Sequence, residues 1–466
     1  MTDSRPRTDA GTIGSAALAA VDPHRLAAVV PWSVGPTGRV VVVGGGKAAA
    51  GLAAGVVTGL ERAGVARGRI DGVISVPVGC GRTVPGVVVR ETRPPALNEP
   101  TAAVVAATRE MIDRVGRLEP ADVAIAVIAG GGSALLEVPA DGVPLPEIVA
   151  VTGALSRAGA GIDDLNTVRR ATSAVKAGGL ARACRAGRMV VLVLSDVAGD
   201  SLDIIASGPC MPSPADPAAA RAVLARHRID RAIAPHLFDH LAGHGDLSAP
   251  RTHATAPVGS PVVASADPGS DHAWTTPQGC RVSHRVVGRN ATAVAAAVTA
   301  ARAAGYDVAT PSPGRPPAAE ERAEQVGRRL LARGSDLAAA ARRDGRPRAW
   351  IEGGEATVVV PADHGHGGRN QQTVLAALAA ADGWPEGMVL ASIATDGEDG
   401  PTDAAGAIAD EHVAAVVDGA AARRGLARCD AYRVLDAAGA LVRTGPTGTN
   451  VADLRVVLVR PDGRSP

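Results

Sequence analysis

Aromatic residues are nearly absent from this chain of 466 residues. Phe, Trp and Tyr together make up 2% of it. Proteins that bind bases or sugars by stacking need aromatic side chains as platforms. The composition therefore argues against a function that depends on stacking.

The chain also has no excess of charge of either sign. Its 48 basic and 47 acidic residues are interspersed and give a net charge of +1. Such a chain has no overall field that would attract nucleic acid or an anionic membrane. No segment approaches the length of a membrane span, and the N-terminus is charged without a long apolar stretch before Val40. We expect a cytoplasmic protein without a nucleic-acid or membrane partner, and the oligomeric state stays open, with a homodimer as one option.

Cysteine is scarce, and its spacing fits neither a disulfide scaffold nor a zinc site. The five cysteines are odd in number, far apart in the sequence and free of CxxC spacing. We expect reduced, scattered thiols. They are Cys80, Cys184, Cys210, Cys280 and Cys429.

Glycine, in contrast, is abundant and follows apolar runs. One run ends in Gly44, Gly45, Gly46 and Lys47, and another ends in the loop Gly130 to Ser133, which includes Gly131 and Gly132. A loop without side chains lets backbone N–H groups approach an anion, and a following helix adds its positive end. This repeated arrangement predicts a phosphate-binding protein.

Strand-like and helix-like patterns alternate along the chain. Continuous apolar runs predict parallel strands that are covered on both faces. The pattern predicts an N-terminal Rossmann-like α/β domain over residues 1–242, a linker or exposed insertion over 243–279, and a C-terminal α/β region over 280–466. The expected strands are Val40 to Val43, Gly72 to Val76, Val87 to Val89, Val123 to Ala129, Met189 to Leu194, Val282 to Val287, segments near Trp350, Val358 and Val389, and Leu454 to Val459. The expected helices are Ser15 to Val30, one after Lys47, Thr101 to Val115, Ala291 to Ala304 and Ala318 to Arg333.

The first glycine loop has two interpretations. Gly44, Gly46 and Ala49 fit the Gly-x-Gly-x-x-Ala spacing of dinucleotide folds, whereas a tight turn with a solvated Lys47 fits about equally well. A lysine at a helix start is unfavourable unless an anion shares the site, which favours binding. The loop is not a P-loop, because Ala48 stands where the metal-binding hydroxyl would be.

The stretch from Asp163 to Gly179 predicts an amphipathic helix that ends at a double glycine. Asn166, Arg169, Ser173 and Lys176 would form one stripe of this helix. Two cations with two hydrogen-bonding groups could bind an anionic substrate, although a solvated face is the commoner meaning of such a stripe.

Acidic residues follow other apolar runs. Asp196 comes directly after a predicted strand, where open α/β sheets bind ligands. It could accept a proton or hold a metal, with Asp200 assisting, or it could cap a helix that begins near Ser201. A later loop clusters Asp396, Glu398, Asp399 and Asp403 without calcium-loop spacing, and EGGE places Glu352 and Glu355 either side of a turn.

Seven motifs, in this order, resemble the glycerate 2-kinase family, whose C-terminal part is the MOFRL domain (here about residues 345–460). They run from about Val42 to Val459 and are VVGGGKAAAG, IAGGGSALLEVPADG, LNTVRRATSAVKAGGLA, LSDVAGDSLDIIASGP, GGRNQ, TDGEDGPTDAAGA and RTGPTGTNVADLRV. The resemblance implies two α/β domains with largely parallel sheets and a cleft between them. It also implies phosphoryl transfer that depends on ATP and Mg²⁺, with a hydroxyl of a small hydroxy acid, D-glycerate by default, as acceptor.

The resemblance also assigns roles to residues. Lys47 and Arg369 would neutralise charge on the transferred phosphoryl group, and Asp196 would receive the hydroxyl proton. Asp196 and Asp396 are the expected metal-side carboxylates. The expected substrate-binding residues are Asn166, Arg169, Lys176 and Asn370. The expected nucleotide-binding residues are Gly44, Gly45, Gly46, Gly130, Gly131, Gly132, Ser133, Thr444, Gly445, Thr447, Gly448, Thr449 and Asn450.

The chain departs from the family pattern at a few positions. Arg93 replaces a histidine, Leu97-Asn98 breaks a Pro-x-Pro-Asp-like segment, Gln372 replaces a common glutamate, and Glu352 replaces a serine. Such changes bear on the substrate more than on the reaction, so a larger sugar acid is a second acceptor.

Two rival functions remain. One is an NAD(P)-dependent hydroxypyruvate reductase. Against it, Asp71 begins the next strand rather than ending it, so it is no ribose-binding acid. The other is a non-catalytic nucleotide-binding protein.

Overall fold

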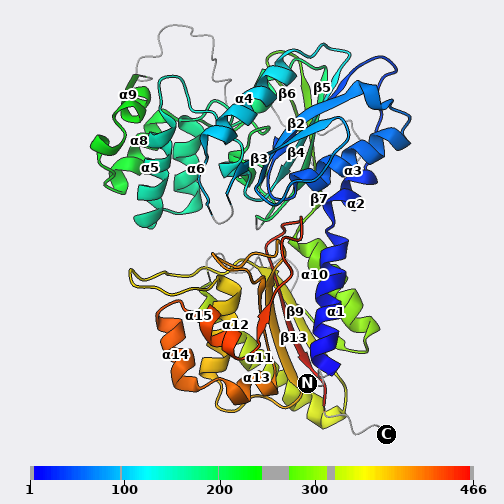
Figure 1. Ribbon diagram of the computed structural model, residues 1–466, viewed down its shortest axis with the longest axis vertical. Coiled ribbons are helices and arrows are strands. Elements are labelled where there is room, and N and C mark those ends of the chain that lie inside the picture. Colours follow the sequence, from blue (N-terminus) through cyan, green and yellow to red (C-terminus); the bar gives the residue numbers. More distant parts are fainter. Residues whose placement is uncertain (1–4, 95–96, 198, 244–271, 312–320, 462–466) are drawn as a thin grey trace. The chain divides into compact units, whose positions relative to one another are not determined.

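The computed structural model describes residues 5–94, 97–197, 199–243, 272–311 and 321–461. The chain divides into two compact units, which are described separately below (Figure 1). Residues 23–287 form one, called here the Lys47 unit. Residues 1–22 and 288–466 form the other, called the Arg369 unit. Most of the expected linker, residues 244–271, lies outside the described residues.

A seven-stranded sheet forms the centre of the Lys47 unit. The strand order is β3-β2-β1-β4-β5-β7-β6. The pairs from β3 to β5 are parallel, and β6 pairs with β7 in antiparallel orientation. The uninterrupted apolar strands β1 and β4 are buried along their whole length, as continuous runs predict. The strand bounds are β1 (Val40–Gly45), β2 (Ile70–Pro77), β3 (Val87–Arg93), β4 (Val123–Ala129), β5 (Arg188–Leu194), β6 (His272–Thr275) and β7 (Arg281–Gly288).

The strand order reverses between β1 and β4. From β1 the chain continues to β2 and β3 on one side, whereas β4 and β5 lie on the other side. In open α/β sheets, ligands bind outside the carboxyl ends of the strands at such a switch point. The loops that follow β1 and β4 are the two glycine-rich loops that contain Lys47 and Ser133.

Two groups of helices complete the Lys47 unit. Residues of α4 and α7 share one core with the strands, and this core also contains Cys184, Cys210 and Cys280, three of the five free cysteines. A second, smaller core joins α5, α6, α8 and α9, which lie side by side in Figure 1. The helix bounds are α2 (Pro23–Ala28), α3 (Ala49–Arg62), α4 (Ala102–Gly116), α5 (Leu145–Arg157), α6 (Ile162–Ala171), α7 (Gly179–Ala183), α8 (Pro217–Arg226) and α9 (Pro235–Gly243), with short 3₁₀ helices η1 (Arg67–Arg69), η2 (Gly132–Ala134), η3 (Ile205–Ser207) and η4 (Arg231–Ile233).

The Arg369 unit contains a six-stranded sheet in the order β12-β11-β10-β13-β9-β8. The α/β class with two sheets is confirmed, but parallel pairing is limited here to β8 with β9. The other four pairs are antiparallel: β13, the last strand, enters between β9 and β10 against both, and β11 runs against both β10 and β12. The strand bounds are β8 (Asp307–Ala309), β9 (Arg348–Gly354), β10 (Met388–Ala394), β11 (Gly406–Ala409), β12 (Leu441–Val442) and β13 (Asp453–Val459). The segment around Val358, an expected strand, is not one.

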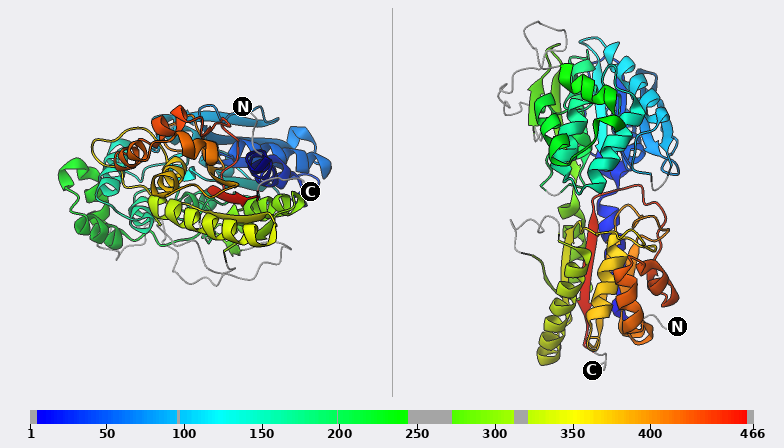
Figure 2. Two further views of the ribbon diagram at one scale, coloured as in Figure 1. Left: turned by 90° about the horizontal axis from the view of Figure 1, so that it is seen from below. Right: turned by 90° about the vertical axis from the view of Figure 1, so that its left-hand side faces the viewer.

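Helices cover both faces of this second sheet (Figures 1 and 2). Helix α1 (Arg5–Ala20) packs beside α10 (Asn290–Ala303), and α11 (Ala323–Asp344) and α12 (Arg369–Ala380) form a core with β10 and β13. The sequence pattern placed residues 1–22 in the N-terminal domain and predicted a single helix from Ser15 to Val30. Instead, α1 joins this unit, where the ion pair of Arg7 with Asp410 has an N–O distance of 2.8 Å. The remaining helices are α13 (Glu411–Val416), α14 (Gly419–Ala427) and α15 (Ala431–Ala437).

The sequence predicts no membrane-spanning segment, and the described helices can be compared with this expectation. Among the described residues, no helix is both long enough and apolar enough to span a bilayer.

A single glycine tests how closely β1 and β4 must pack. Gly44 has φ +138°, and a Cβ at this position would lie 2.0 Å from the carbonyl oxygen of Val127. We expect Gly44→Ala to lower the free energy of unfolding by more than about 4 kcal/mol, because both backbone strain and a backbone clash oppose it. Gly68→Ala is the control, since no atom lies within 4 Å of its Cβ position, and its effect should stay within about 1 kcal/mol. Urea unfolding measures both, and equal effects would contradict the packing account.

Candidate functional site

Lys47 lies between the two glycine-rich loops at the carboxyl edge of the first sheet. Its backbone N–H donates to the carbonyl of Gly130 at 2.9 Å. A Cβ on Gly131 would lie 3.7 Å from the Cγ atom of Lys47, so the lysine side chain extends against the second loop. Helix α3 begins directly afterwards at Ala49, and Ala48 provides no side-chain cap. The arrangement places an ammonium group at a helix N-terminus, a combination that favours an anion.

The glycines of the first loop have a packing role. Cβ atoms on Gly44 and Gly46 would lie 2.0 and 2.6 Å from carbonyl oxygens of β4. These two glycines are therefore required for the close approach of the strands, whether or not a ligand is bound. The prediction that they contact a nucleotide stays a prediction.

Lys176 is not on the helix that the sequence predicts. Helix α6 ends at Ala171, and an isolated β-bridge then pairs Ser173 with Pro139. The expected helical stripe of Asn166, Arg169, Ser173 and Lys176 is therefore wrong beyond Arg169. The chain turns back after Ala171, because Ser173 donates to the buried carboxylate of Glu137 at 2.5 Å and leaves the helical path.

The ammonium group of Lys176 is fully buried and fully used. Its Nζ donates to the carbonyl oxygens of Ser133 at 2.9 Å and Leu136 at 2.8 Å, and it lies 3.1 Å from Glu137 Oε2. Burial, together with the nearby positive charge of Arg169, lowers the pKa of Lys176, and the opposing effect of Glu137 does not reverse this. In this structure Lys176 holds the second glycine loop in shape rather than presenting a free cation.

Asp196 follows β5 at the same edge of the sheet. Its neighbour Ser195 is buried, and β5 pairs in parallel with β4, whose loop carries Ser133. The alternative in which Asp196 caps a helix near Ser201 is wrong, because the chain forms turns there and then only the short helix η3. Lys47, Ser133 and Asp196 thus follow three adjacent parallel strands, β1, β4 and β5.

Arg369 is the first residue of α12 and belongs to the other unit. Its Nε and Nη2 atoms donate to the two carboxylate oxygens of Asp453 at 2.8 and 3.0 Å, and Nη1 lies 3.0 Å from Glu355. Burial lowers the pKa of Arg369, but these carboxylates more than offset it and hold the pKa above its ordinary value. Asp453 is completely buried, whereas the Glu355 side chain is 56% exposed.

Asp399 caps the N-terminus of α12. Its carboxylate accepts the backbone N–H groups of Asn370 at 3.0 Å and Gln371 at 2.8 Å. Burial raises the pKa of Asp399 to about 6, although these hydrogen bonds act in the opposite direction. A Cβ on Gly368 would lie 2.3 Å from Asp399, so this glycine of the GGRNQ motif makes room for the acidic loop.

Asn370, an expected substrate-binding residue, is 1% exposed and bonded on both sides of its amide. Its Nδ2 donates to Asp453 and Asp399, and its Oδ1 accepts from Ser392. This side chain therefore holds the strands and α12 together.

The two loops near Arg369 are interlocked. Thr447 donates its N–H to the carbonyl of Asp396 at 3.1 Å and its hydroxyl to that of Thr395 at 2.6 Å. A Cβ on Gly397 would lie 2.0 Å from the carbonyl oxygen of Gly445. The hydroxyl of Thr449, an expected nucleotide contact, is buried and donates to Val21 at 2.7 Å. The remaining expected nucleotide contacts of this loop are Thr444, Gly448 and Asn450, for which the structure provides no test.

The described residues of the two units offer single carboxylates rather than a cluster of metal ligands. Within the described ranges, no group of three or more His, Cys, Asp or Glu side chains could hold a metal ion. Asp196 and Asp396 belong to different units. Mg²⁺ is commonly bound through one or two carboxylates plus phosphate oxygens, so single carboxylates of this kind suit a metal that arrives with a nucleotide.

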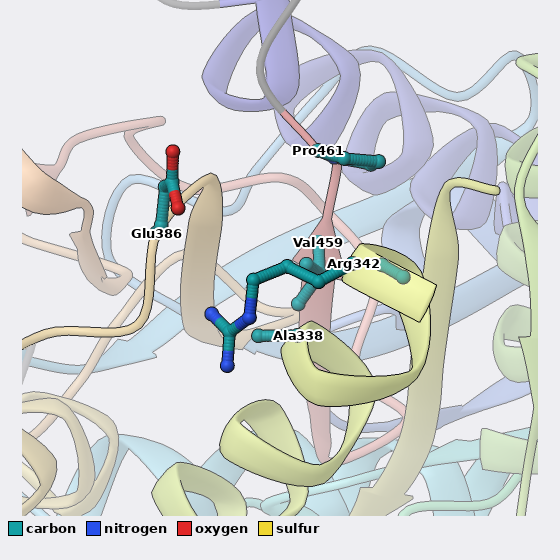
Figure 3. A pocket seen from close by; sticks show the side chains of 6 residues that line it. Ala338, Arg342, Glu386, Val459 and Pro461 are labelled. Carbon is teal, nitrogen blue, oxygen red and sulfur yellow. The ribbon is translucent and has the colours of Figure 1, made fainter. Parts of the chain in front are cut away.

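A cavity of about 290 Å³ borders Arg369 in its own unit. Apolar side chains of Ala356, Val358 and Val360 line it together with Gln372 and the Gly367-Gly368 pair. Another pocket of this unit lies at the opposite end of β13 from Asp453, where Arg342, Glu386 and Val459 line it (Figure 3). That second pocket contains no residue of the candidate site.

The departures from the family pattern have local explanations. Glu352 is buried and ion-paired with Arg329 at 2.8 Å and Arg455 at 3.2 Å. Gln372 donates to Glu324 and to the carbonyl of Leu426. Arg93 is 4% exposed and donates to the carbonyl of Leu97, while Pro95 and Ala96 between them lie outside the described residues.

Several residues of the site were missed by the sequence reasoning. Glu137, Ser207 and Asp453 hold Lys176, Asn166 and Arg369 respectively. The spacing carries no signal for these three residues, although the sequence marks one of their partners in another way: Lys47 and Lys176 are the only lysines among the 48 basic residues. A compact ammonium group differs from a guanidinium in size and hydrogen bonding, so positions that keep lysine in an arginine-rich chain point to a site.

Comparison with known proteins identifies the family. A model described as a domain of unknown function (DUF4147) matches residues 9–242, and the MOFRL family model matches residues 348–453. The D-glycerate 2-kinase of Thermotoga maritima is 34% identical over 370 residues, which are 77% of this chain and 78% of that protein. A crystal structure of a glycerate kinase from the same organism matches with a TM-score of 0.75 and 30% identity, covering 97% of this chain and 99% of that one.

These matches define the class as a kinase that transfers phosphate to a hydroxyl group. The chain belongs to the glycerate kinase family with a MOFRL C-terminal domain. Not all relatives bear this name: a protein of Agrobacterium vitis, 34% identical over 96% of this chain and 93% of its own length, is named as a candidate hydroxypyruvate reductase.

The raised pKa of Asp399 predicts a pH-dependent stability. A carboxyl whose pKa rises on folding, here from 3.8 to about 6, stabilises the fold below pH 3.8 and loses this contribution as pH rises through 6. We expect the stability of the native protein relative to Asp399→Asn to fall by on the order of 2 kcal/mol between about pH 4 and pH 7. The lost hydrogen bond in the variant adds only an offset that does not vary with pH. Denaturant unfolding across this range measures the difference, and a constant difference would contradict the raised pKa.

The buried Lys176–Glu137 pair predicts that a variant lacking both charges has a higher free energy of unfolding than a variant lacking the lysine alone. Lys176→Met leaves Glu137 buried without its cation, so we expect a loss of about 3 to 5 kcal/mol in the free energy of unfolding. Adding Glu137→Gln removes the uncompensated charge and should recover a large part of the loss. Urea unfolding of the two variants measures this coupling, and purely additive losses would show that the pair does not act as a unit.

Proposed function

We propose that this protein transfers the γ-phosphoryl group of ATP to the 2-hydroxyl of D-glycerate and releases 2-phosphoglycerate. The observation that carries the proposal is the arrangement of Lys47, Ser133 and Asp196 after adjacent parallel strands at the switch point of the first sheet. Relatives named D-glycerate 2-kinase and glycerate kinase support the choice of reaction.

Two cations would compensate the charge that develops on the phosphoryl group. Phosphoryl transfer is catalysed chiefly by positioning and electrostatic stabilisation. Lys47 offers an ammonium group at the start of α3, and Arg369 offers a guanidinium held by the buried Asp453. The contact of Arg369 with the exposed Glu355 is the one that an incoming phosphate can replace.

Asp196 would accept the proton of the attacking hydroxyl. It follows β5 at the ligand-binding edge of the sheet, where the cap role is excluded by the absence of a helix at Ser201 in the described chain. Transfer of a proton to a positioned carboxylate makes the hydroxyl oxygen the stronger nucleophile at the moment of attack.

Mg²⁺ would enter with ATP as part of the substrate. Asp396, whose Oδ1 accepts the N–H of Glu398 at 3.0 Å, and Asp196 are the two expected metal-side carboxylates. The ion would supply charge neutralisation of the phosphate oxygens. The interlocked loops at Thr447 and Asp396, and the neighbouring cavity at Arg369, are the parts of the Arg369 unit proposed for the nucleotide.

The reductase alternative has less support in the first sheet. A dinucleotide fold places the ribose-binding acid at the carboxyl end of the second strand. Asp71 lies instead at the amino end of β2, where it pairs with Arg114 at 2.5 Å. The turn Val78 to Arg82 that follows β2 contains no Asp or Glu.

Three variants test the assigned roles by their turnover. We expect Asp196→Asn to lower kcat about 100- to 10,000-fold, because a general base is lost. Lys47→Arg should also lower kcat, since a guanidinium cannot replace a compact ammonium group in the tight loop. Arg369→Lys keeps the charge beside Asp453 but loses the two-pronged contact and should lower activity without unfolding the protein. ADP release with D-glycerate, and the mass of the product, measure all three.

The control is Asp113→Asn, an exposed carboxylate on α4, which should leave kcat unchanged. The acceptor screen includes longer aldonic acids to test the sugar-acid alternative. If every acid is inert while hydroxypyruvate consumes a reduced nicotinamide, the protein is a reductase. If nucleotide binds with no turnover of any acid, the kinase proposal is equally wrong.

A further inference from the structure

Three polar side chains meet beside the loop that follows β4, and one of them has unused donors. The Oγ atoms of Ser133 and Ser207 are 3.1 Å apart, and Ser207 donates to Asn166 Oδ1 at 2.8 Å. Asn166 is 0% exposed, and its Nδ2 has no partner among the residues described. A buried donor left unpaired costs about 1 to 3 kcal/mol. Such a group indicates a place where a ligand belongs.

The backbone at Ser207 is held in an unfavourable conformation. Ala206 and Ser207 have φ values of +53° and +62°, and Gly208 follows with +67°. Residues with a Cβ rarely adopt this left-handed region, and consecutive examples gather at functional sites. The conformation presents the Ser207 hydroxyl to both Ser133 and Asn166.

Arg169 brings a positive charge that no carboxylate neutralises directly. It lies three residues after Asn166 on α6 and therefore on the same face of the helix. Among the described residues it makes no hydrogen bond or ion pair. The carboxylate that acts on it electrostatically is Glu137, which already pairs with Lys176.

The charge count of this cluster favours a small anion. The charges of Lys176 and Glu137 cancel, so Arg169 gives the cluster one net positive charge. A carboxylate has one negative charge, whereas the phosphates of a nucleotide have several. The planar guanidinium also matches a carboxylate with two parallel hydrogen bonds.

We propose that Arg169, Ser133 and the unpaired Nδ2 of Asn166 bind the carboxylate of the hydroxy-acid acceptor, and that Ser207 is a positioning residue for Ser133 and Asn166. The inference rests on the proposed function and reassigns Ser133 from the nucleotide to the acceptor. A 2-hydroxy acid has its reacting hydroxyl on the carbon next to the carboxylate. The carboxylate site must therefore lie close to the reacting groups, and Lys47, whose Cγ would lie 3.7 Å from a Cβ on Gly131 in the same loop, meets this requirement.

Ligand-induced shifts in Tm test the site without any need for turnover. D-glycerate alone and ADP alone are added to the native protein, to Arg169→Gln, to Ser207→Ala and to the control Arg109→Gln, which changes an exposed arginine of α4. We expect Arg169→Gln to weaken glycerate binding about 10- to 100-fold, the loss typical of one charge-assisted contact, and to leave ADP binding within about twofold. The control should leave both ligands unaffected.

Turnover supplies a second measurement. Ser207→Ala should raise the KM for glycerate severalfold, with the KM for ATP unchanged, as a purely structural role would not do selectively. Arg169→Lys should recover part of the affinity that Arg169→Gln loses. Glyceraldehyde, a neutral analogue of glycerate, should bind equally weakly to native protein and Arg169→Gln.

The outcomes separate this inference from the kinase proposal. If no acid is phosphorylated but Arg169→Gln still loses glycerate binding, the carboxylate site stands and the kinase proposal fails. If ADP or inorganic phosphate binding falls while glycerate binding persists, the cluster is a phosphate site and the inference is overturned. If Arg169→Gln does not fold, Ser207→Ala and Arg169→Lys decide the question by the same comparison of the two ligands.

Discussion

The close contact of β1 with β4 is the constraint on which the candidate site depends. Glycines at 44 and 46 let the two strands approach until a Cβ would strike carbonyl oxygens of β4. At this point the strand order reverses, and the two loops that follow meet at Lys47, whose N–H donates to the carbonyl of Gly130. The second loop is then held by Lys176, which donates to the carbonyl oxygen of Ser133 in the loop and to that of Leu136 just after it. Backbone packing and one buried charge together set the shape of this edge.

In the Arg369 unit, a buried polar network holds the elements around Arg369 in place. Asp453, Asp399 and Asn370 connect β13, the acidic loop and the start of α12 through hydrogen bonds. Each buried charge has a partner, as low-dielectric surroundings require. Arg369 is the member of the network with an exposed partner, Glu355. The contact of Arg369 with Asp453 is therefore buried and fixed, whereas its contact with Glu355 can be exchanged. A residue proposed to bind phosphate requires both properties.

Long apolar runs predicted the first sheet well, because burial on both faces leaves a clear signal in the sequence. The strand from Val123 to Ala129 was predicted with its observed bounds. Pairing direction in the second sheet had no such signal, since it depends on where β13 inserts. The helix through Lys176 was overpredicted because its spacing fits a helical stripe, while the hydrogen bond of Ser173 to Glu137 ends that path. Partners distant in sequence, such as Asp453 for Arg369, could not be deduced from spacing.

Packing of the first helix with the last strand has a consequence for biosynthesis. Helix α1 is complete at Ala20, but its neighbour β13 ends at Val459. At about 5 to 20 residues per second, a ribosome needs roughly half a minute or more to produce the intervening chain. The buried face of α1, which includes Ile13 and Ala17, lacks its first partner until α10 (Asn290–Ala303) emerges and lacks its full set of partners until β13 is made. The Lys47 unit, encoded entirely between α1 and α10, can complete its folding first, so the nascent chain carries α1 without its partners while that whole unit is made.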